Sequence, residues 1–177
     1  MRPTLSFSAL GLILGLVALT AATRLLPHPP NFTPVIALAL FCGAALPKRW
    51  MGLAAIGGVM LLTDLLLGWH ASLLAVYATL ALITLGGRTL NLNSSAGTVL
   101  GGSFAAACLF FLLTNFAVWA GSGMYPPTLE GLVACYVAGI PFFGNSLAST
   151  LLFSALLFGL GRRGVHALPG QAQAATA

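Results

Sequence analysis

Few residues of this 177-residue chain could do chemistry, and those few are polar groups set between long apolar runs. Only two acids occur, Asp64 and Glu130, and Asp64 lies inside an apolar stretch that continues as TDLLLGWH. An ionisable residue in such a place is costly and needs a partner. Arg24, at the end of the first apolar run, is the basic residue placed to provide it. We expect the two to pair, either at a binding site or as a neutral bridge between helices.

Five further polar or aromatic residues are predicted to lie near this pair. Their distances from the nearest loops place each of them in the same outer third of the membrane. The candidate substrate-binding set is Arg24, Asn31, Asp64, Tyr77, Asn115, Trp119 and Asn145. A structural role is an open alternative for single members, since Asn side chains often bond neighbouring helices and aromatic residues often anchor at the interface. The phenylalanine pairs at 110–111 and 142–143 are interpreted as lipid-facing or core residues.

Catalysis, metal binding and nucleic-acid binding find no support in the sequence. There is no Gly-rich phosphate loop carrying a Lys, and the polar set holds no His beside a Ser or Cys for a hydrolytic triad. Cys42, Cys108 and Cys135 form no CxxC pair and have no ligand spacing with His. The net charge of +5 comes from basic residues scattered between apolar runs, whereas nucleic-acid binding needs a basic face. We therefore expect no enzyme activity, cofactor, metal or nucleic-acid partner.

The elements that must position these residues are membrane helices. The chain is 59% hydrophobic and 5% charged, whereas a soluble domain carries about 25% charged residues. In lipid every backbone polar group must be bonded internally, which leaves helices or a closed barrel. Long apolar runs without period-2 alternation exclude the barrel. We predict an all-α, polytopic membrane bundle, with one transmembrane domain at 1–164 and a disordered cytoplasmic tail at 165–177.

Six apolar segments are predicted to cross the membrane, with a short extra helix over 128–138 before the last of them. The segments run over about 5–26, 34–46, 51–68, 71–85, 96–120 and 141–163. The second is only about 20 Å long at 1.5 Å per residue, against a hydrocarbon thickness of about 30 Å. The loop at 27–33 must then reach membrane depth, which is tolerated only where backbone lines a cavity or is buried.

The basic residues predict the orientation of the bundle. Lys and Arg accumulate in cytoplasmic loops, and six crossings leave only Arg24 on the outer side, together with both acids, His28 and His70. The cytoplasmic set is Arg2, Lys48, Arg49, Arg88, Arg162 and Arg163. Both termini are therefore expected in the cytoplasm, in a multi-pass protein of the bacterial inner (plasma) membrane.

Four motifs carry a resemblance to a known family. They are NFTPVIALALFCGA, TDLLLGWH, TNFAVW and YPPTLEGLVACYVAGIPFFGN. Together they resemble an uncharacterised bacterial family of six-helix membrane transport proteins, over nearly the whole chain to about Gly161. More loosely, the layout resembles the substrate-binding S components of energy-coupling factor transporters, which have six helices, both ends in the cytoplasm and a pocket open to the outside.

This second resemblance implies partners as well as a ligand. S components bind a small molecule outside and dock on a coupling subunit, driven by ATPases, through an Ala-x-x-x-Ala pattern on the first helix. Ala18 and Ala22 match that pattern in form, and Gly11 and Gly15 are the alternative pair. We expect a small-molecule binding or transport protein. The rival hypothesis is a structural or assembly protein whose polar cluster only holds the bundle together.

Overall fold

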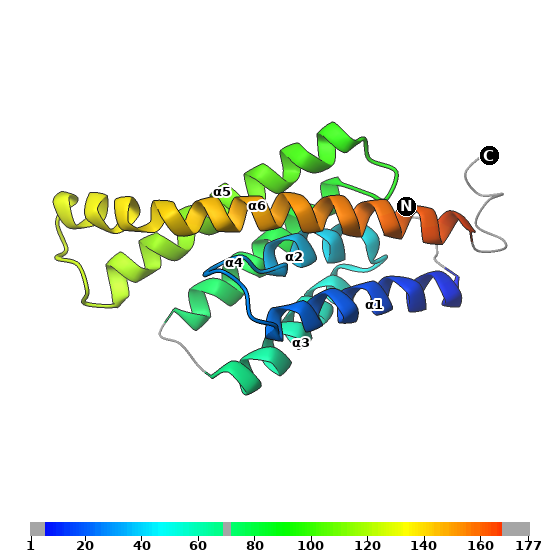
Figure 1. The fold of residues 1–177 in the computed structure, drawn as a ribbon, viewed down its shortest axis with the longest axis horizontal. Coiled ribbons are helices and arrows are strands. Elements are labelled where there is room, and N and C mark those ends of the chain that lie inside the picture. Colours follow the sequence, from blue (N-terminus) through cyan, green and yellow to red (C-terminus); the bar gives the residue numbers. More distant parts are fainter. Residues whose placement is uncertain (1–5, 69–71, 168–177) are drawn as a thin grey trace.

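The computed structural model describes residues 6–68 and 72–167, and within these ranges the chain is all-helical, as predicted. Figure 1 shows α6 running the length of the molecule, with α5 crossing it and α2 in the middle of the bundle. The α-helices are α1 (Phe7–Ala22), α2 (Val35–Ala45), α3 (Arg49–Leu67), α4 (Leu73–Gly86), α5 (Ala96–Gly121) and α6 (Leu129–Ala167). Two short 3-10 turns, η1 (Thr23–Leu25) and η2 (Gly87–Thr89), follow α1 and α4.

Local signals in the sequence explain several of these helix ends. Ser6 and Ser95 precede α1 and α5, and their hydroxyls accept hydrogen bonds from the backbone N–H groups of Ala9 and Thr98. Such caps satisfy N–H groups that have no partner inside the helix. Gly68, with a φ of 94°, ends α3 in a backbone conformation that residues with a Cβ rarely adopt.

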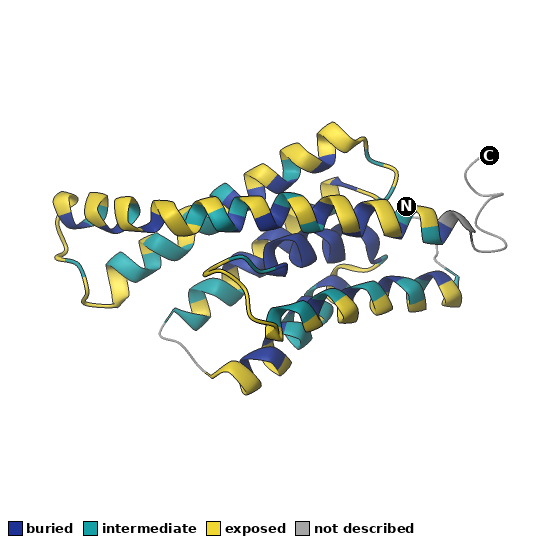
Figure 2. Ribbon diagram, viewed as in Figure 1, coloured by how far each residue is buried: buried dark blue, intermediate teal, exposed yellow. Residues whose placement is uncertain are grey.

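Length and surface character mark the chain as a membrane protein. Four helical segments of the described chain are long and apolar enough to cross a membrane: Phe7–Leu25, Arg49–Leu67, Ala96–Gly121 and Leu129–Val165. Their outward faces carry large apolar side chains, such as Leu62 and Leu66 of α3, and Figure 2 shows exposed residues along the outside of every long helix. Soluble proteins rarely expose apolar surface on this scale. Six crossings stay a prediction, since α2 and the Leu73–Thr89 segment are shorter.

Helix α2 is the centre of the bundle. All of its residues, Val35–Ala45, are buried, and Figure 2 shows it as a dark element enclosed by the others. It contacts each of the other five α-helices. At 1.5 Å per residue its 11 residues span about 16 Å. The predicted short second helix is therefore confirmed, and it is shielded from lipid along its whole length.

Two glycines allow the backbone of α2 to contact the backbone at the end of α4 directly. A Cβ atom at Gly43 would lie 1.9 Å from the carbonyl oxygen of Thr84, and one at Gly87 would lie 2.4 Å from the carbonyl oxygen of Leu40. Small residues at helix interfaces let backbones pack closely in membranes. This contact fixes α4 against the core.

The last helix differs from the prediction. A separate helix over 128–138 and a new helix from Pro141 were expected, yet α6 runs unbroken from Leu129 to Ala167 with Pro141 inside it. Proline removes one hydrogen bond and crowds the carbonyl of residue 137, but α6 packs along α5 on both sides of that point. Neighbouring helices are what make proline tolerable within membrane helices. Its 39 residues span about 58 Å, so α6 is longer than the hydrocarbon layer.

Some predictions fall at or beyond the ends of the described ranges. Helix α6 continues through Ala167, past the predicted boundary at 164, and residues 168–177 of the predicted tail lie outside the described residues. Trp69 and His70, predicted at the outer interface, also lie outside them.

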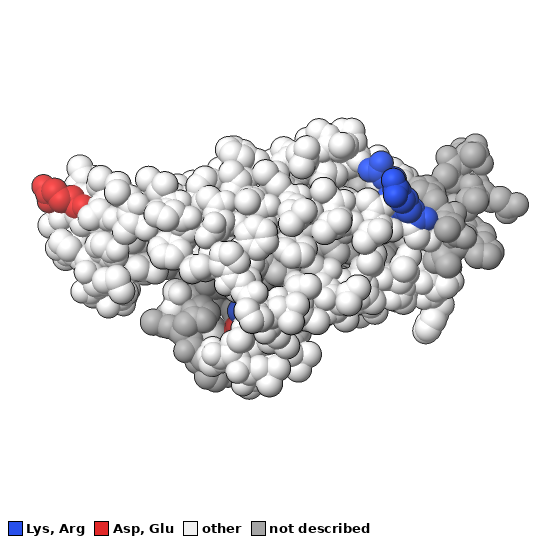
Figure 3. Space-filling model, viewed as in Figure 1, with Lys and Arg blue, Asp and Glu red and all other residues white. Residues whose placement is uncertain are grey.

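Exposed charges of opposite sign lie toward opposite ends of α6. Figure 3 shows basic side chains near the end of α6 and an acidic side chain where α6 begins, and Glu130 is in the first turn of that helix. The predicted orientation requires such a separation, with the basic end in the cytoplasm. The orientation itself stays a prediction.

Candidate binding cavity

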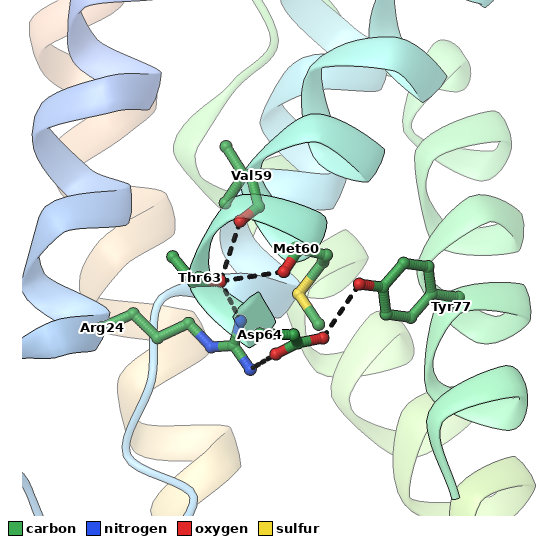
Figure 4. Close-up of polar contacts among 6 residues, drawn as sticks. All are labelled: Arg24, Val59, Met60, Thr63, Asp64 and Tyr77. Atoms are coloured by element: carbon green, nitrogen blue, oxygen red, sulfur yellow. Dashed lines mark hydrogen bonds and ion pairs between the residues drawn. The ribbon is translucent and has the colours of Figure 1, made fainter. Parts of the chain in front are cut away.

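Arg24 and Asp64 form the predicted ion pair. Arg24 belongs to η1, directly after α1, and an Nη atom of its guanidinium donates to Oδ1 of Asp64 at 2.7 Å. The other Nη donates to the hydroxyl of Thr63, whose own proton goes to the carbonyl of Val59 at 2.8 Å. Figure 4 shows the guanidinium reaching across to α3 between these two partners. The pair therefore joins the end of α1 to α3.

Tyr77 completes the surroundings of the carboxylate. Its hydroxyl donates to Oδ2 of Asp64 at 2.9 Å, from α4 on the side opposite Arg24. Asp64 is 1% exposed, while the Arg24 side chain is 13% exposed. A buried carboxylate without partners would be very costly, and two donors with one full positive charge offset that cost. The network ties three helices together around one acid.

A cavity of about 390 Å³ lies beside this network. It is bounded by η1, the loop before α2 and the first turn of α2, Met60 of α3, the start of α4, and the facing sides of α5 and α6. Figure 3 shows basic and acidic atoms together in a recess beneath the α5–α6 pair. The polar side chains in its wall include Arg24, Asn31, Thr33, Thr114, Asn115 and Ser146.

The loop at 27–33 is fixed against α6. Asn145 donates its side-chain amide to the carbonyl of Pro30 at 2.9 Å, and the hydroxyl of Ser146 donates to the carbonyl of Asn31 at 3.4 Å. Asn31 has a φ of 60°, a left-handed conformation in which Asn is among the more tolerant residues. The predicted role of this loop as a cavity wall agrees with these contacts.

The seven predicted site residues fall into four groups. Arg24, Asn31 and Asn115 line the cavity. Asp64 stands behind Arg24 and binds its guanidinium, and Tyr77 donates to Asp64 from the other side. Asn145 fixes the loop rather than lining the cavity.

Trp119 stands apart from the other six. Its indole N–H donates to the carbonyl of Pro126 at 3.0 Å, within the connection between α5 and α6. This contact shapes the turn, and Trp119 is absent from the cavity wall.

Aromatic residues that sequence reasoning assigned to lipid or core form much of the wall. The side chains of Phe110, Phe111, Phe142 and Phe143 all line the cavity. The ring centroids of Phe111 and Phe143 are 4.9 Å apart, so α5 and α6 are in contact at this point. Helical spacing could have placed Phe111 at the cavity, because it is four residues before Asn115 and shares its helix face.

Asn115 reaches the cavity because α6 has no side chain opposite it. A Cβ atom at Gly139 would lie 2.6 Å from Oδ1 of Asn115 and 2.9 Å from Cε2 of Phe111. The amide nitrogen of Asn115 donates to the backbone carbonyl of Phe111 at 2.8 Å. Its side-chain oxygen therefore projects toward Gly139 and the cavity.

One family model matches residues 6–166 of the chain, and its description is a family of unknown function, DUF6580. No curated protein and no solved structure matches. Within the described ranges, no three His, Cys, Asp or Glu residues are grouped closely enough to hold a metal ion.

Proposed function

We propose that this chain, which belongs to the family of unknown function DUF6580, binds a small molecule in the cavity beside Arg24 and takes part in its transport. One observation carries the proposal: a guanidinium held by a buried acid reaches the wall of a cavity that is otherwise largely aromatic and aliphatic. Ligand sites in proteins have this character, with apolar walls and a few convergent polar groups.

The size of the cavity supports a ligand larger than water. Its volume of about 390 Å³ lies within the range of about 300–1,000 Å³ that small-molecule sites occupy. An ionisable residue at membrane depth usually marks a pathway or a binding site. With the predicted orientation, the cavity lies in the outer part of a bacterial inner-membrane protein, where a ligand enters from outside.

An exposed face of α1 supports docking to another membrane subunit. Gly11, Gly15, Ala18 and Ala22 are all exposed and, at helical spacing, share one face of α1. No atom lies within 4 Å of a Cβ placed at either glycine. Small residues in this pattern allow close helix contact. A coupling subunit with its ATPases fits this face, by analogy with S components, and transport without such partners is the alternative.

The rival function is structural. It is favoured by the closure of the polar network, since both oxygens of Asp64 have donors without any ligand. In that case the cavity is a packing defect and the pair only ties helices together.

Ligand binding in the cavity separates the two functions. The purified protein in detergent is screened by thermal unfolding against a broad panel of carboxylates, amines and neutral compounds. Val118→Phe fills the cavity wall, and Val133→Phe, at an exposed position of α6, adds the same atoms elsewhere. We expect stabilisation by some compounds that Val118→Phe abolishes and Val133→Phe retains, followed by uptake of those compounds into cells. Stabilisation by no compound, or equal stabilisation of both variants, contradicts the proposal.

A further inference from the structure

We propose that the ligand carries a single carboxylate, bound by Arg24, and an N–H or O–H donor at its other end, bound by Asn115 and Thr114. This inference rests on the proposed function and adds the chemical class of the ligand. It follows from which atoms in the two polar walls are committed to other partners and which are left to the cavity.

Arg24 presents donors to the cavity. A guanidinium has five N–H groups. Among the described residues, one N–H of Arg24 goes to Thr63 and one to Asp64, which leaves three. Arg24 lines the cavity and Asp64 does not, since its carboxylate is buried behind the guanidinium. A ligand therefore meets the cationic side of the pair, and planar guanidinium groups bind carboxylates with matched geometry.

The single cation that the described residues place in the cavity wall favours one negative charge on the ligand. A monocarboxylate faces the Arg24 guanidinium directly, whereas Asp64 lies behind it. A phosphate monoester would bring nearly two charges, and no second Lys or Arg of the described residues lines the cavity to meet the other one. A cationic ligand finds no free carboxylate in the cavity wall among the described residues.

The wall formed by α5 presents acceptors instead. The Thr114 hydroxyl proton goes to the carbonyl of Phe110 at 2.7 Å, which leaves the oxygen lone pairs. The Asn115 amide nitrogen is committed to the carbonyl of Phe111, and its Oδ1 has no hydrogen-bond partner among the described residues. A ligand atom that carries a proton, such as an amide, ring N–H or hydroxyl group, suits both oxygens.

Aromatic side chains determine what the middle part of the ligand, between its carboxylate and its donor group, can be. Phe110 and Phe111 come from α5, and Phe142 and Phe143 come from α6. Faces and edges of such rings pack best against flat or aliphatic groups. The ligand class is therefore an arylalkyl or similarly apolar monocarboxylate with a donor at its far end.

Three matched probes test this class: indolepropionate, its neutral amide indolepropionamide, and naphthylpropionate, which lacks the ring N–H. Binding to the protein in detergent is measured by calorimetry and thermal unfolding. We expect the amide to bind at least about tenfold more weakly than the acid, as loss of a charge-assisted hydrogen bond implies. Naphthylpropionate should bind severalfold more weakly than indolepropionate.

A folded variant without the cation provides the decisive comparison. Arg24→Gln alone leaves Asp64 buried and unpaired, so Arg24→Gln is combined with Asp64→Asn, which keeps the site neutral. In the double variant the preference for the acid over the amide should vanish. The control is Arg163→Gln, which removes an exposed arginine at the other end of the molecule and should preserve the preference.

Each outcome decides the inference. An amide that binds as well as the acid, or a preference that survives in the double variant, overturns it. Binding only of amines or neutral compounds, abolished by Val118→Phe, overturns the ligand class while the proposed function stands. Failure of the whole panel to bind overturns both.

Discussion

The guanidinium of Arg24 and the carboxylate of Asp64 lie 2.7 Å apart, although 40 residues separate them in the sequence. The contact forms between η1 and the C-terminal part of α3, and Asp64 is the more deeply buried partner. Because the Asp64 side chain is 1% exposed, protein groups rather than water must offset its charge, and we expect the fold to depend on Arg24.

Removal of one charge should destabilise the protein, and removal of both should restore part of the loss. Breaking a buried ion pair costs about 3–5 kcal/mol, because the remaining charge is uncompensated. We expect Arg24→Gln and Asp64→Asn each to lower the unfolding temperature in detergent, and the double variant to unfold above the less stable single variant. Additive losses in the double variant would show that the two residues do not act as a pair.

The same double variant separates a binding role from a structural one. A purely structural pair should regain function along with stability, since neutral Gln and Asn can still hydrogen-bond. A ligand-binding pair should regain stability while uptake or binding stays lost, because the ligand needs the charge of Arg24.

Tyr77→Phe should lower the free energy of unfolding, because it removes the hydroxyl that bonds Asp64. The change leaves Oδ2 of Asp64 without its donor, and hydrogen bonds to charged groups contribute about 1.5–3 kcal/mol. Thermal unfolding should show a clear loss. Tyr125→Phe is the matched control, since no described residue bonds that hydroxyl, and it should unfold like the wild type. Equal behaviour of the two variants would argue against the assigned hydrogen bond.

Gly139→Ala should close the cavity at Asn115. The added methyl group would lie 2.6 Å from Oδ1 of Asn115, so the side chain or the helix must shift. Gly144→Ala, on the same helix, meets no atom within 4 Å and should be tolerated. We expect loss of ligand-induced stabilisation only in Gly139→Ala. Retained binding in that variant would place the ligand elsewhere.

Two substitutions at Asn31 distinguish the effect of backbone strain from the effect of lost ligand contact. Glycine suits its φ of 60°, so Asn31→Gly should keep the fold while it removes a side chain from the cavity wall. Asn31→Val forces a β-branched residue into a left-handed conformation, which costs about 1–3 kcal/mol. Thermal unfolding should rank Val below Gly and wild type, and binding should weaken in both. Full binding by Asn31→Gly would remove Asn31 from the site.

Labelling of single cysteines tests the orientation. In a background without native cysteines, an impermeant maleimide should label Met124→Cys from outside the cell. Arg49→Cys, Thr89→Cys and Arg163→Cys should react only from the cytoplasmic side, as the basic loops predict. Labelling after permeabilisation controls for accessibility. Reaction of Thr89→Cys from outside would overturn the six-crossing topology.

The ion pair and the short second helix could be predicted from sequence because each rests on a strong physical constraint. A lone acid in an apolar run needs a nearby cation, and a 13-residue apolar segment cannot cross a bilayer of about 30 Å. The four phenylalanines were harder to place, because the rotation of α5 and α6 about their axes depends on packing between them. A phenylalanine that faces lipid and one that faces a cavity cannot be told apart by residue type alone.

Two features could not be predicted from the sequence, the contact between Asn145 and Pro30 and the continuity of α6 through Pro141. Asn145 bonds the carbonyl of Pro30, 115 residues earlier, and nothing local to either residue indicates that contact. Pro141 was predicted to begin a helix, since proline is favoured at that position. The structure keeps the helix continuous because α5 supports it on both sides, which is a tertiary effect that overrides the local preference.

The enclosure of α2 has a consequence for how the protein is synthesised. An apolar helix of 11 residues is about 16 Å long and cannot cross a bilayer of about 30 Å by itself, so it has no stable transmembrane position as it leaves the ribosome. The neighbours that cover it include α4 and α6, and α6 is made last. Nascent chains that stop before α6 should therefore hold α2 at the membrane surface, and its entry into the bilayer should be among the final steps of biogenesis.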